Sequence, residues 1–178
     1  MTIRRMMIPE TIKIRFMEQK NLFISYLEYD SMEELPPSDR ELLEHAKIAV
    51  DSAYAPYSHY KVGAAVRMGN GKIITGNNQE NMAFPSGLCA ERVALFAAAS
   101  ANPGIAVKAI AITAKSLQFP VEKPVTPCGS CRQAIIEYEM LSSEKIRIIL
   151  MGETGKVLTI EGMETLLPLS FKEEGLKK

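Results

Sequence analysis

Three cysteines are the residues of this chain best suited to chemistry. Cys128 and Cys131 lie in the run Cys128-Gly129-Ser130-Cys131, and Cys89 precedes them in the sequence. A two-residue gap between cysteines allows both thiolates to bind one metal ion. Three thiolates alone would leave the fourth position of a tetrahedral zinc ion for water, as in catalytic zinc sites. Because zinc strongly acidifies a bound water, the trio predicts hydrolytic chemistry.

Charged residues close to the cysteines would complete such a site. Glu91 follows Cys89 by two residues, a spacing that puts a carboxylate beside the metal without making it a ligand. There it would take a proton from water and pass it to a substrate. Three thiolates overcompensate the charge of zinc, and Arg92 and Arg132 are candidates to offset the excess from around the ligands.

Two other interpretations of the cysteines stay open at this point. A Cys-x-x-Cys pair is also typical of redox couples, but that interpretation leaves Cys89 and Glu91 without a role. A closed structural zinc site would need His45 or His59 as a fourth ligand. We expect His45 in the middle of a helix as a surface or packing residue, and His59 in a loop that borders the site.

The elements that must position these residues are two helices. Residues 90–101 are rich in alanine and suit a buried helix that begins directly after Cys89. Pro127 favours a first helical turn, and residues 128–138 continue as a helix. Both cysteine sites are therefore expected at helix N-termini, whose positive dipole end favours thiolates.

The other elements predict the fold class. Ser38 and Glu41 form a capping box for a helix that should stop by Ala55, because Pro56 follows. The alternation of helices and strands predicts a three-layer α/β/α sandwich on a mixed five-stranded sheet. The expected strands are residues 62–68 and 72–77, joined by a turn at Gly69-Asn70-Gly71, and residues 105–114, 146–151 and 156–160.

The first 37 residues differ from the rest. Residues 12–16 alternate apolar and charged side chains, which is typical of a strand with one wet face, and residues 32–37 are typical of a linker. We therefore divide the chain into an N-terminal extension of unknown role (1–37) and a catalytic domain (38–178).

Composition narrows the functional classes. The 178 residues suit one domain, with 47% apolar and 24% charged residues. Equal numbers of basic and acidic residues, 21 each, argue against a protein that binds nucleic acid through a broad basic surface. No run approaches the ~20 apolar residues that span a bilayer, so no membrane partner is expected. Three cysteines make no disulfide framework, and the expected compartment is the cytoplasm.

The motifs around the cysteines resemble the zinc-dependent cytidine deaminases of the small, three-cysteine, homotetrameric kind. The resemblance lies in Cys89-Ala90-Glu91-Arg92 and in Pro127-Cys128-Gly129-Ser130-Cys131-Arg132-Gln133. It extends to Ala55-Pro56-Tyr57-Ser58, Val62-Gly63-Ala64-Ala65, Gly76-Asn77-Asn78-Gln79-Glu80-Asn81 and Leu166-Leu167-Pro168 with Phe171. It covers about residues 38–176, with no counterpart for the first 37.

The resemblance implies a role for each matching residue. It makes Cys89, Cys128 and Cys131 the ligands of one zinc ion per subunit, and Glu91 the proton shuttle. Asn78 and Glu80 would hold the ribose 3′-hydroxyl, and Ala90 would present backbone groups to the base. Tyr60 falls where the family usually has a phenylalanine near the base. The resemblance places Phe84 and Phe171 at aromatic positions that complete pockets across subunit boundaries of a homotetramer.

The function implied is deamination of cytidine and 2′-deoxycytidine in pyrimidine salvage. The first alternative is a deaminase of a modified cytosine nucleoside such as a nucleoside antibiotic, and the feature that discriminates the two is the pocket around Tyr60 and Phe84. The run Phe84-Pro85-Ser86-Gly87 departs from the family pattern and bears on the shape of the base pocket. A deaminase of RNA or DNA would need a basic cluster, which the sequence does not show. The non-enzymatic alternative is a zinc-stabilised binding module.

Overall fold

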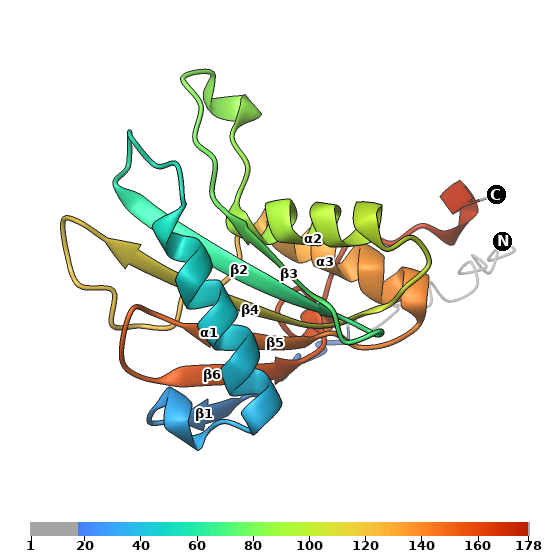
Figure 1. Cartoon of the computed structure of the whole chain (residues 1–178). Helices are drawn as coiled ribbons and strands as arrows, with labels where there is room; N and C mark the ends of the chain where they lie inside the picture. Colours follow the sequence, from blue (N-terminus) through green and yellow to red (C-terminus); the bar gives the residue numbers. More distant parts are fainter. Residues whose placement is uncertain (1–17, 178) are drawn as a thin grey trace, which may run out of the picture.

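A mixed six-stranded sheet forms the middle of the molecule (Figure 1). The computed structural model describes residues 18–177. The strand order is β1-β6-β5-β4-β2-β3, in which β4 and β5 are parallel and every other neighbouring pair is antiparallel. The strands are β1 (Leu27–Tyr29), β2 (Tyr60–Met68), β3 (Ile73–Asn77), β4 (Val107–Ser116), β5 (Arg147–Met151) and β6 (Val157–Glu161).

Helices cover both faces of this sheet and complete three layers (Figure 1). Helix α1 (Pro37–Asp51) lies on one face, and α2 (Ala90–Ala101) and α3 (Gly129–Ser142) lie on the other. Each interface holds its own apolar core, because alternate residues of a strand point to opposite faces. Short 3-10 helices occur at Met32–Glu34, Phe84–Ser86, Met163–Thr165 and Glu174–Lys177.

Two glycines allow α1 and α2 to lie close against the strands. A β-carbon at Gly63 would come within 2.2 Å of the Ala46 carbonyl oxygen on α1. A β-carbon at Gly76 would come within 2.4 Å of the Ala94 nitrogen on α2. Contacts this short do not occur between real atoms, so glycine is required at both positions. Gly76 thus fixes the distance of α2, the helix that begins at Cys89, from the sheet.

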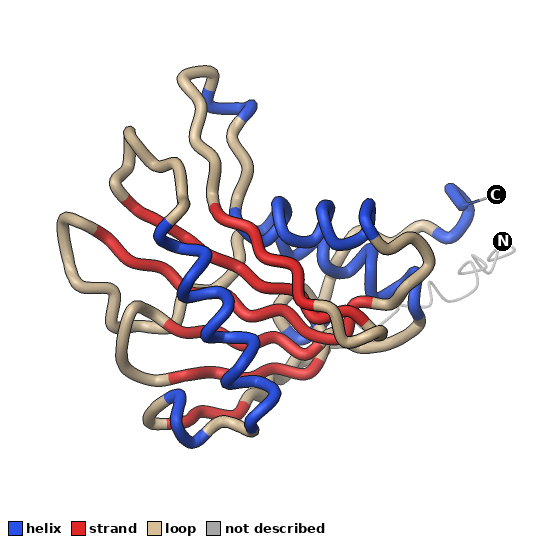
Figure 2. The backbone as a smooth tube through the Cα atoms, viewed as in Figure 1, coloured by secondary structure: helices blue, strands red, loops and turns tan. Residues whose placement is uncertain are grey.

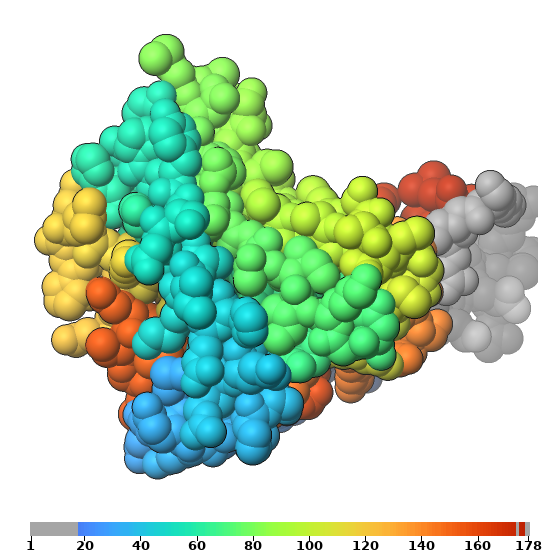
Figure 3. All heavy atoms as spheres, in the orientation of Figure 1, coloured from blue at the N-terminus to red at the C-terminus, as the bar shows by residue number. Residues whose placement is uncertain are grey.

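The loops around the site gather at one end of the sheet (Figure 2). They are residues 52–59, before β2, residues 78–89, after β3, and residues 117–128, after β4. In the space-filling view the segment around residues 80–88 stands out from the surface beside residues 52–59 (Figure 3). Within residues 18–177, no helix has the length and apolar character needed to cross a bilayer.

The predicted α/β/α class is confirmed, with two corrections. The sheet has six strands rather than five, because β1 joins its edge from within the extension. The capping box is wrong: α1 begins at Pro37, Ser38 makes no side-chain cap, and Glu41 pairs with Arg67 instead. Proline is pre-organised for the first helical position, so the cap lies at Pro36, two residues before the predicted cap. The strand predicted at residues 12–16 lies outside the described residues.

Candidate active site

Two helices begin at cysteines and point their N-termini at one place. Cys89 is the residue that caps α2, and Cys128 caps α3. The Cys89 carbonyl accepts hydrogen bonds from the amides of Arg92 and Val93, both at 3.1 Å, which starts the α2 turn. Neither cysteine side chain caps its helix, so both sulfurs remain available. The predicted placement of these sulfurs at positive helix ends is confirmed.

The three sulfurs form a cluster of the right size for a zinc ion. Cys128 Sγ lies 3.5 Å from Cys131 Sγ and 3.9 Å from Cys89 Sγ, and all three sulfurs lie within 4.8 Å of one another. Zinc–sulfur bonds of about 2.3 Å in a tetrahedron place sulfurs about 3.8 Å apart. The cluster therefore fits zinc with little adjustment. Among the described residues this group contains no histidine or carboxylate, so a closed four-ligand site lacks its fourth donor.

The sulfurs differ in how readily they ionise. The hydrogen bond from the Cys131 thiol, opposed by partial burial and aided by Arg92, lowers the pKa of Cys89 to about 5. The same contact and burial raise the pKa of Cys131. Cys131 is fully buried, whereas Cys128 is exposed at the end of the loop. The lowered pKa of Cys89 favours its thiolate, the form in which a cysteine binds a metal ion.

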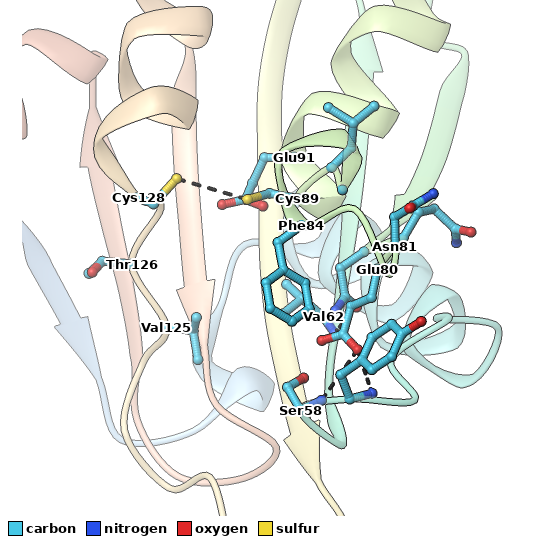
Figure 4. Close-up of a pocket in the computed structure, with 15 residues that line it drawn as sticks. Ser58, Val62, Glu80, Asn81, Phe84, Cys89, Glu91, Val125, Thr126 and Cys128 are labelled. Carbon is cyan, nitrogen blue, oxygen red and sulfur yellow. Dashed lines mark hydrogen bonds between the residues drawn. The ribbon is translucent and has the colours of Figure 1, made fainter.

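Glu91 lies in the first turn of α2 beside the sulfurs. Its side chain is only 5% exposed, and Figure 4 shows its carboxylate directed toward Cys89 and Cys128. Burial raises the pKa of Glu91, and the nearby Cys89 charge raises it further. A raised pKa brings a buried carboxyl closer to the pH at which it can both accept and return protons, which is what general acid–base catalysis requires.

The two arginines occupy different positions around the cluster. Arg92 Nη2 lies 3.8 Å from Cys89 Sγ, so its charge acts directly on that sulfur. Arg132 instead donates through Nε to the Pro127 carbonyl at 2.8 Å and through Nη1 to the Leu166 carbonyl at 2.7 Å. Arg132 therefore braces the loop before Cys128 and the C-terminal segment.

A cavity of about 560 Å³ opens in front of the sulfurs, within the usual size range of small-molecule sites (Figure 4). Its lining includes Cys89, Glu91 and Cys128 at the metal end. The rest of the wall comes from the three loops and the start of β2: Tyr57, Ser58, Val62, Asn78, Gln79, Glu80, Asn81, Phe84, Gly87, Leu88, Val125 and Thr126.

Asn78 and Glu80 both line this cavity and both hold the surrounding loops. The Asn78 carboxamide accepts from the Val62 amide at 2.8 Å and donates to the Tyr60 carbonyl at 3.0 Å. Glu80 Oε2 accepts from the amides of Tyr57 at 2.8 Å and Ser58 at 3.3 Å. Burial raises the pKa of Glu80, but these bonds and the Ser58 hydroxyl outweigh it, so the pKa lies below its ordinary value.

The aromatic candidates divide into two groups. Phe84 lines the cavity, packs edge-on against Tyr57 with ring centres 5.9 Å apart, and is largely exposed. Tyr60 stacks on Phe119, with ring centres 6.1 Å apart, and does not line the cavity.

Ala90 and Phe171 also lie outside the lining of this cavity. Ala90 is fully buried in the first turn of α2. Phe171 is exposed, and the Gln133 side chain holds it through both of its backbone groups. Within one chain, Phe171 is therefore not brought to the site.

Sequence reasoning missed several residues of the cavity wall. Val125 and Thr126 line the cavity from the opposite side to Phe84 (Figure 4). Their only sequence signal is that they directly precede Pro127 and Cys128. Tyr57 and Ser58 belong to a motif noted in the sequence, but Glu80 is what ties them to the site.

Comparisons with known proteins agree with this geometry. Residues 36–143 match the family profile described as the cytidine and deoxycytidylate deaminase zinc-binding region. A cytidine deaminase of Halalkalibacterium halodurans is 39% identical over 78% of this chain and 98% of its own. A cytidine deaminase of Sporosarcina psychrophila is 38% identical over 76% of this chain and 93% of its own. The crystal structure of a cytidine deaminase from Burkholderia pseudomallei superposes with a TM-score of 0.63, at 40% identity, covering 74% of this chain and 97% of that one.

The fold, the sulfur cluster and the matched region define a zinc-dependent deaminase. Zinc is thus confirmed as the cofactor expected from the sequence. The chain belongs to the cytidine deaminase family, and it is an enzyme of that family.

Proposed function

We propose that this enzyme converts cytidine and 2′-deoxycytidine, with water, to the uridine forms and ammonia. The observation that carries the proposal is the buried Glu91 carboxylate beside three sulfurs at the end of a cavity of about 560 Å³. Cys89, Cys128 and Cys131 would hold one zinc ion per subunit. When bound, the ion supplies Lewis acidity that makes a water molecule nucleophilic at neutral pH.

Glu91 moves the protons of the reaction. Its carboxylate accepts a proton from the attacking water and delivers it to ring nitrogen N3, which makes C4 more electrophilic. A second proton transferred through Glu91 lets the amino group leave as ammonia. The raised pKa of Glu91 supports this role, because one group must serve as base and then as acid. Arg92 offsets thiolate charge through its contact with Cys89.

The loops bind and orient the nucleoside. Asn78 and Glu80 hold the ribose 3′-hydroxyl, with the carboxylate as acceptor and the carboxamide as donor or acceptor. Phe84 covers the base, Ala90 offers backbone groups to its edge, and Tyr60 supports the loop wall from behind. Because Phe84 and Phe171 are 75% and 71% exposed, we place them at subunit boundaries of a homotetramer, where Phe171 completes a neighbouring site. Arg132 keeps the segment that leads to Phe171 in place.

The proposed setting is pyrimidine salvage in the cytoplasm. The test is ammonia release from cytidine and from deoxycytidine, with and without a chelator. We expect turnover of both nucleosides, loss of turnover with the chelator, and recovery on adding zinc. Negligible turnover of both, with activity on a modified cytosine nucleoside, would overturn the substrate assignment, and turnover of neither class would overturn the enzyme assignment for nucleosides.

A further inference from the structure

Side chains of α3 hold the C-terminal segment, by which we mean residues 166–173. None of these residues belongs to a helix or a strand, so their backbone groups need partners outside the sheet. Arg132 donates to the Leu166 carbonyl at 2.7 Å. Leu166 and Leu167 also pack against the apolar core between α3 and the sheet. The start of the segment is therefore anchored to α3 and to the core.

A second anchor lies at Phe171. Gln133 Nε2 donates to the Phe171 carbonyl at 2.9 Å, and Gln133 Oε1 accepts from the Phe171 amide at 3.2 Å. One carboxamide thus bonds both backbone groups of one residue, as a hydrogen-bonded partner does in an antiparallel sheet. The adjacent Lys172 pairs with Glu164, just before the segment, and holds the same stretch again. The backbone of Phe171 is therefore fixed by contacts within one chain.

The side chain of Phe171 is not held in this way. Its ring is exposed and stacks on no other aromatic ring among residues 18–177. Ordering a backbone costs conformational entropy, and here the ordering covers no apolar surface of the ring. Fixing a loop beforehand in the conformation that it has in a complex strengthens binding. A fixed backbone beneath an exposed ring therefore favours a contact of that ring with another chain.

We propose that Gln133 is a positioning residue that fixes the backbone of Phe171 and so presents its ring to the active site of a neighbouring subunit. The inference rests on the proposed function, in which Phe171 completes that neighbouring site. Gln133 follows Cys131 by two residues on α3, so one stretch of helix holds the metal of one site and orients an aromatic wall of the next. Gln133 does not line the cavity of its own chain, so its effect on the reaction passes through Phe171.

Limited proteolysis tests the anchor without any substrate. Full-length, zinc-loaded protein is digested with trypsin, and cleavage after Lys172, which directly follows Phe171, is measured by mass spectrometry. Gln133→Met keeps the length of the side chain but removes both hydrogen bonds. Cleavage at this bond should become about 5- to 150-fold faster, the equivalent of two hydrogen bonds of ordinary strength. Gln133→Glu keeps the acceptor and loses the donor, so its rate should lie between those of wild type and Gln133→Met.

Ser142→Ala is the matched control for these variants. The Ser142 hydroxyl also makes a hydrogen bond from an α3 side chain to a backbone group, the Tyr138 carbonyl at 2.9 Å. It holds no part of the C-terminal segment, so cleavage after Lys172 should stay at the wild-type rate.

Steady-state kinetics test whether Gln133 acts through the ring. Gln133→Met and Phe171→Ala should each raise KM for cytidine by about 2- to 13-fold, as loss of one aromatic contact does, with kcat nearly unchanged. The double variant should be no worse than Phe171→Ala alone, because the ring that Gln133 positions is already absent. The zinc-to-protein ratio, measured in the same samples, should stay at the wild-type value because no sulfur is altered.

Three results would overturn the proposal. Equal cleavage of Gln133→Met and wild type after Lys172 would show that Gln133 does not fix the segment. Full additivity in the double variant would show that Gln133 acts by another route. An unchanged KM for Phe171→Ala would show that the ring contributes to no site. If Gln133→Met does not fold, Gln133→Glu decides both measurements.

The two measurements separate this proposal from the proposed function. Absence of wild-type turnover of cytidine would refute the proposed function, and the cleavage rates would still decide whether Gln133 fixes the segment. Normal turnover with equal cleavage rates would instead overturn the role of Gln133 and leave deamination standing.

Discussion

Replacing Glu91 by glutamine separates proton transfer from metal binding. Glutamine keeps the volume and the hydrogen-bonding shape of the side chain but cannot accept and return a proton. Glu80 is the other carboxylate of the cavity lining, but the amides of Tyr57 and Ser58 hold its Oε2 in the loop wall, so it offers no substitute for Glu91. Positioned acid–base groups contribute about 10²–10⁴-fold to rates. We therefore expect kcat for cytidine to fall by about 10²–10⁴-fold, or about 2.7–5.5 kcal/mol in the barrier.

The assay follows ammonia release from cytidine under single-turnover and steady-state conditions, with zinc measured in the same samples. Because the three sulfurs are untouched, Glu91→Gln should keep the wild-type zinc-to-protein ratio. Glu80→Gln is the matched comparison, since it removes a carboxylate from the same cavity and should act mainly on KM. A Glu91→Gln enzyme with full zinc and a kcat within about tenfold of wild type would show that the proton moves by another route.

Three further changes test the metal site and the elements that position it. Cys131→Ala should release zinc and lower the melting temperature, because metal binding is coupled to folding; full zinc by metal analysis would contradict this. Gly76→Ala should lower the free energy of unfolding by about 1–3 kcal/mol in urea titrations, whereas Gly69→Ala, whose nearest neighbour is the flexible end of Lys108, should change it little. Asn78→Ala should lower the free energy of unfolding by about 1–3 kcal/mol, because the Val62 amide loses its hydrogen-bond acceptor. An unchanged urea midpoint would show that this hydrogen bond does not stabilise the fold.

The metal site was predictable from sequence because its signals are local. Cys-x-x-Cys, the proline before it, and a glutamate two residues after a cysteine all act within one helical turn. Helix α2 runs over residues 90–101 as predicted, because its alanines suit a helix buried against the sheet. The five predicted strands, β2 to β6, begin within two residues of their predicted starts. Their signals are also local, since apolar runs and neighbouring glycines mark them.

The sixth strand and the cavity wall were not predictable in this way. β1 has only three residues, and it is a strand because β6 offers it an edge more than one hundred residues later in the sequence. Leu35, expected in a linker, is buried in the core beneath α1. Nothing local distinguishes these residues from a loop. Long-range pairing decides their structure, and a single sequence does not reveal which edge is free.

Asn78 shows why binding residues are harder to identify than metal ligands. Its carboxamide joins the end of β3 to β2 through Val62 and Tyr60, so the same atoms that face the cavity also hold its wall together. Asn78 Oδ1 retains a second lone pair and Nδ2 a second hydrogen, which leaves one acceptor and one donor for a ligand. A residue of this kind gives the same sequence signal as a strand-end turn. Only its place in the lining of the cavity that Cys89 and Glu91 also line distinguishes it from a purely structural residue.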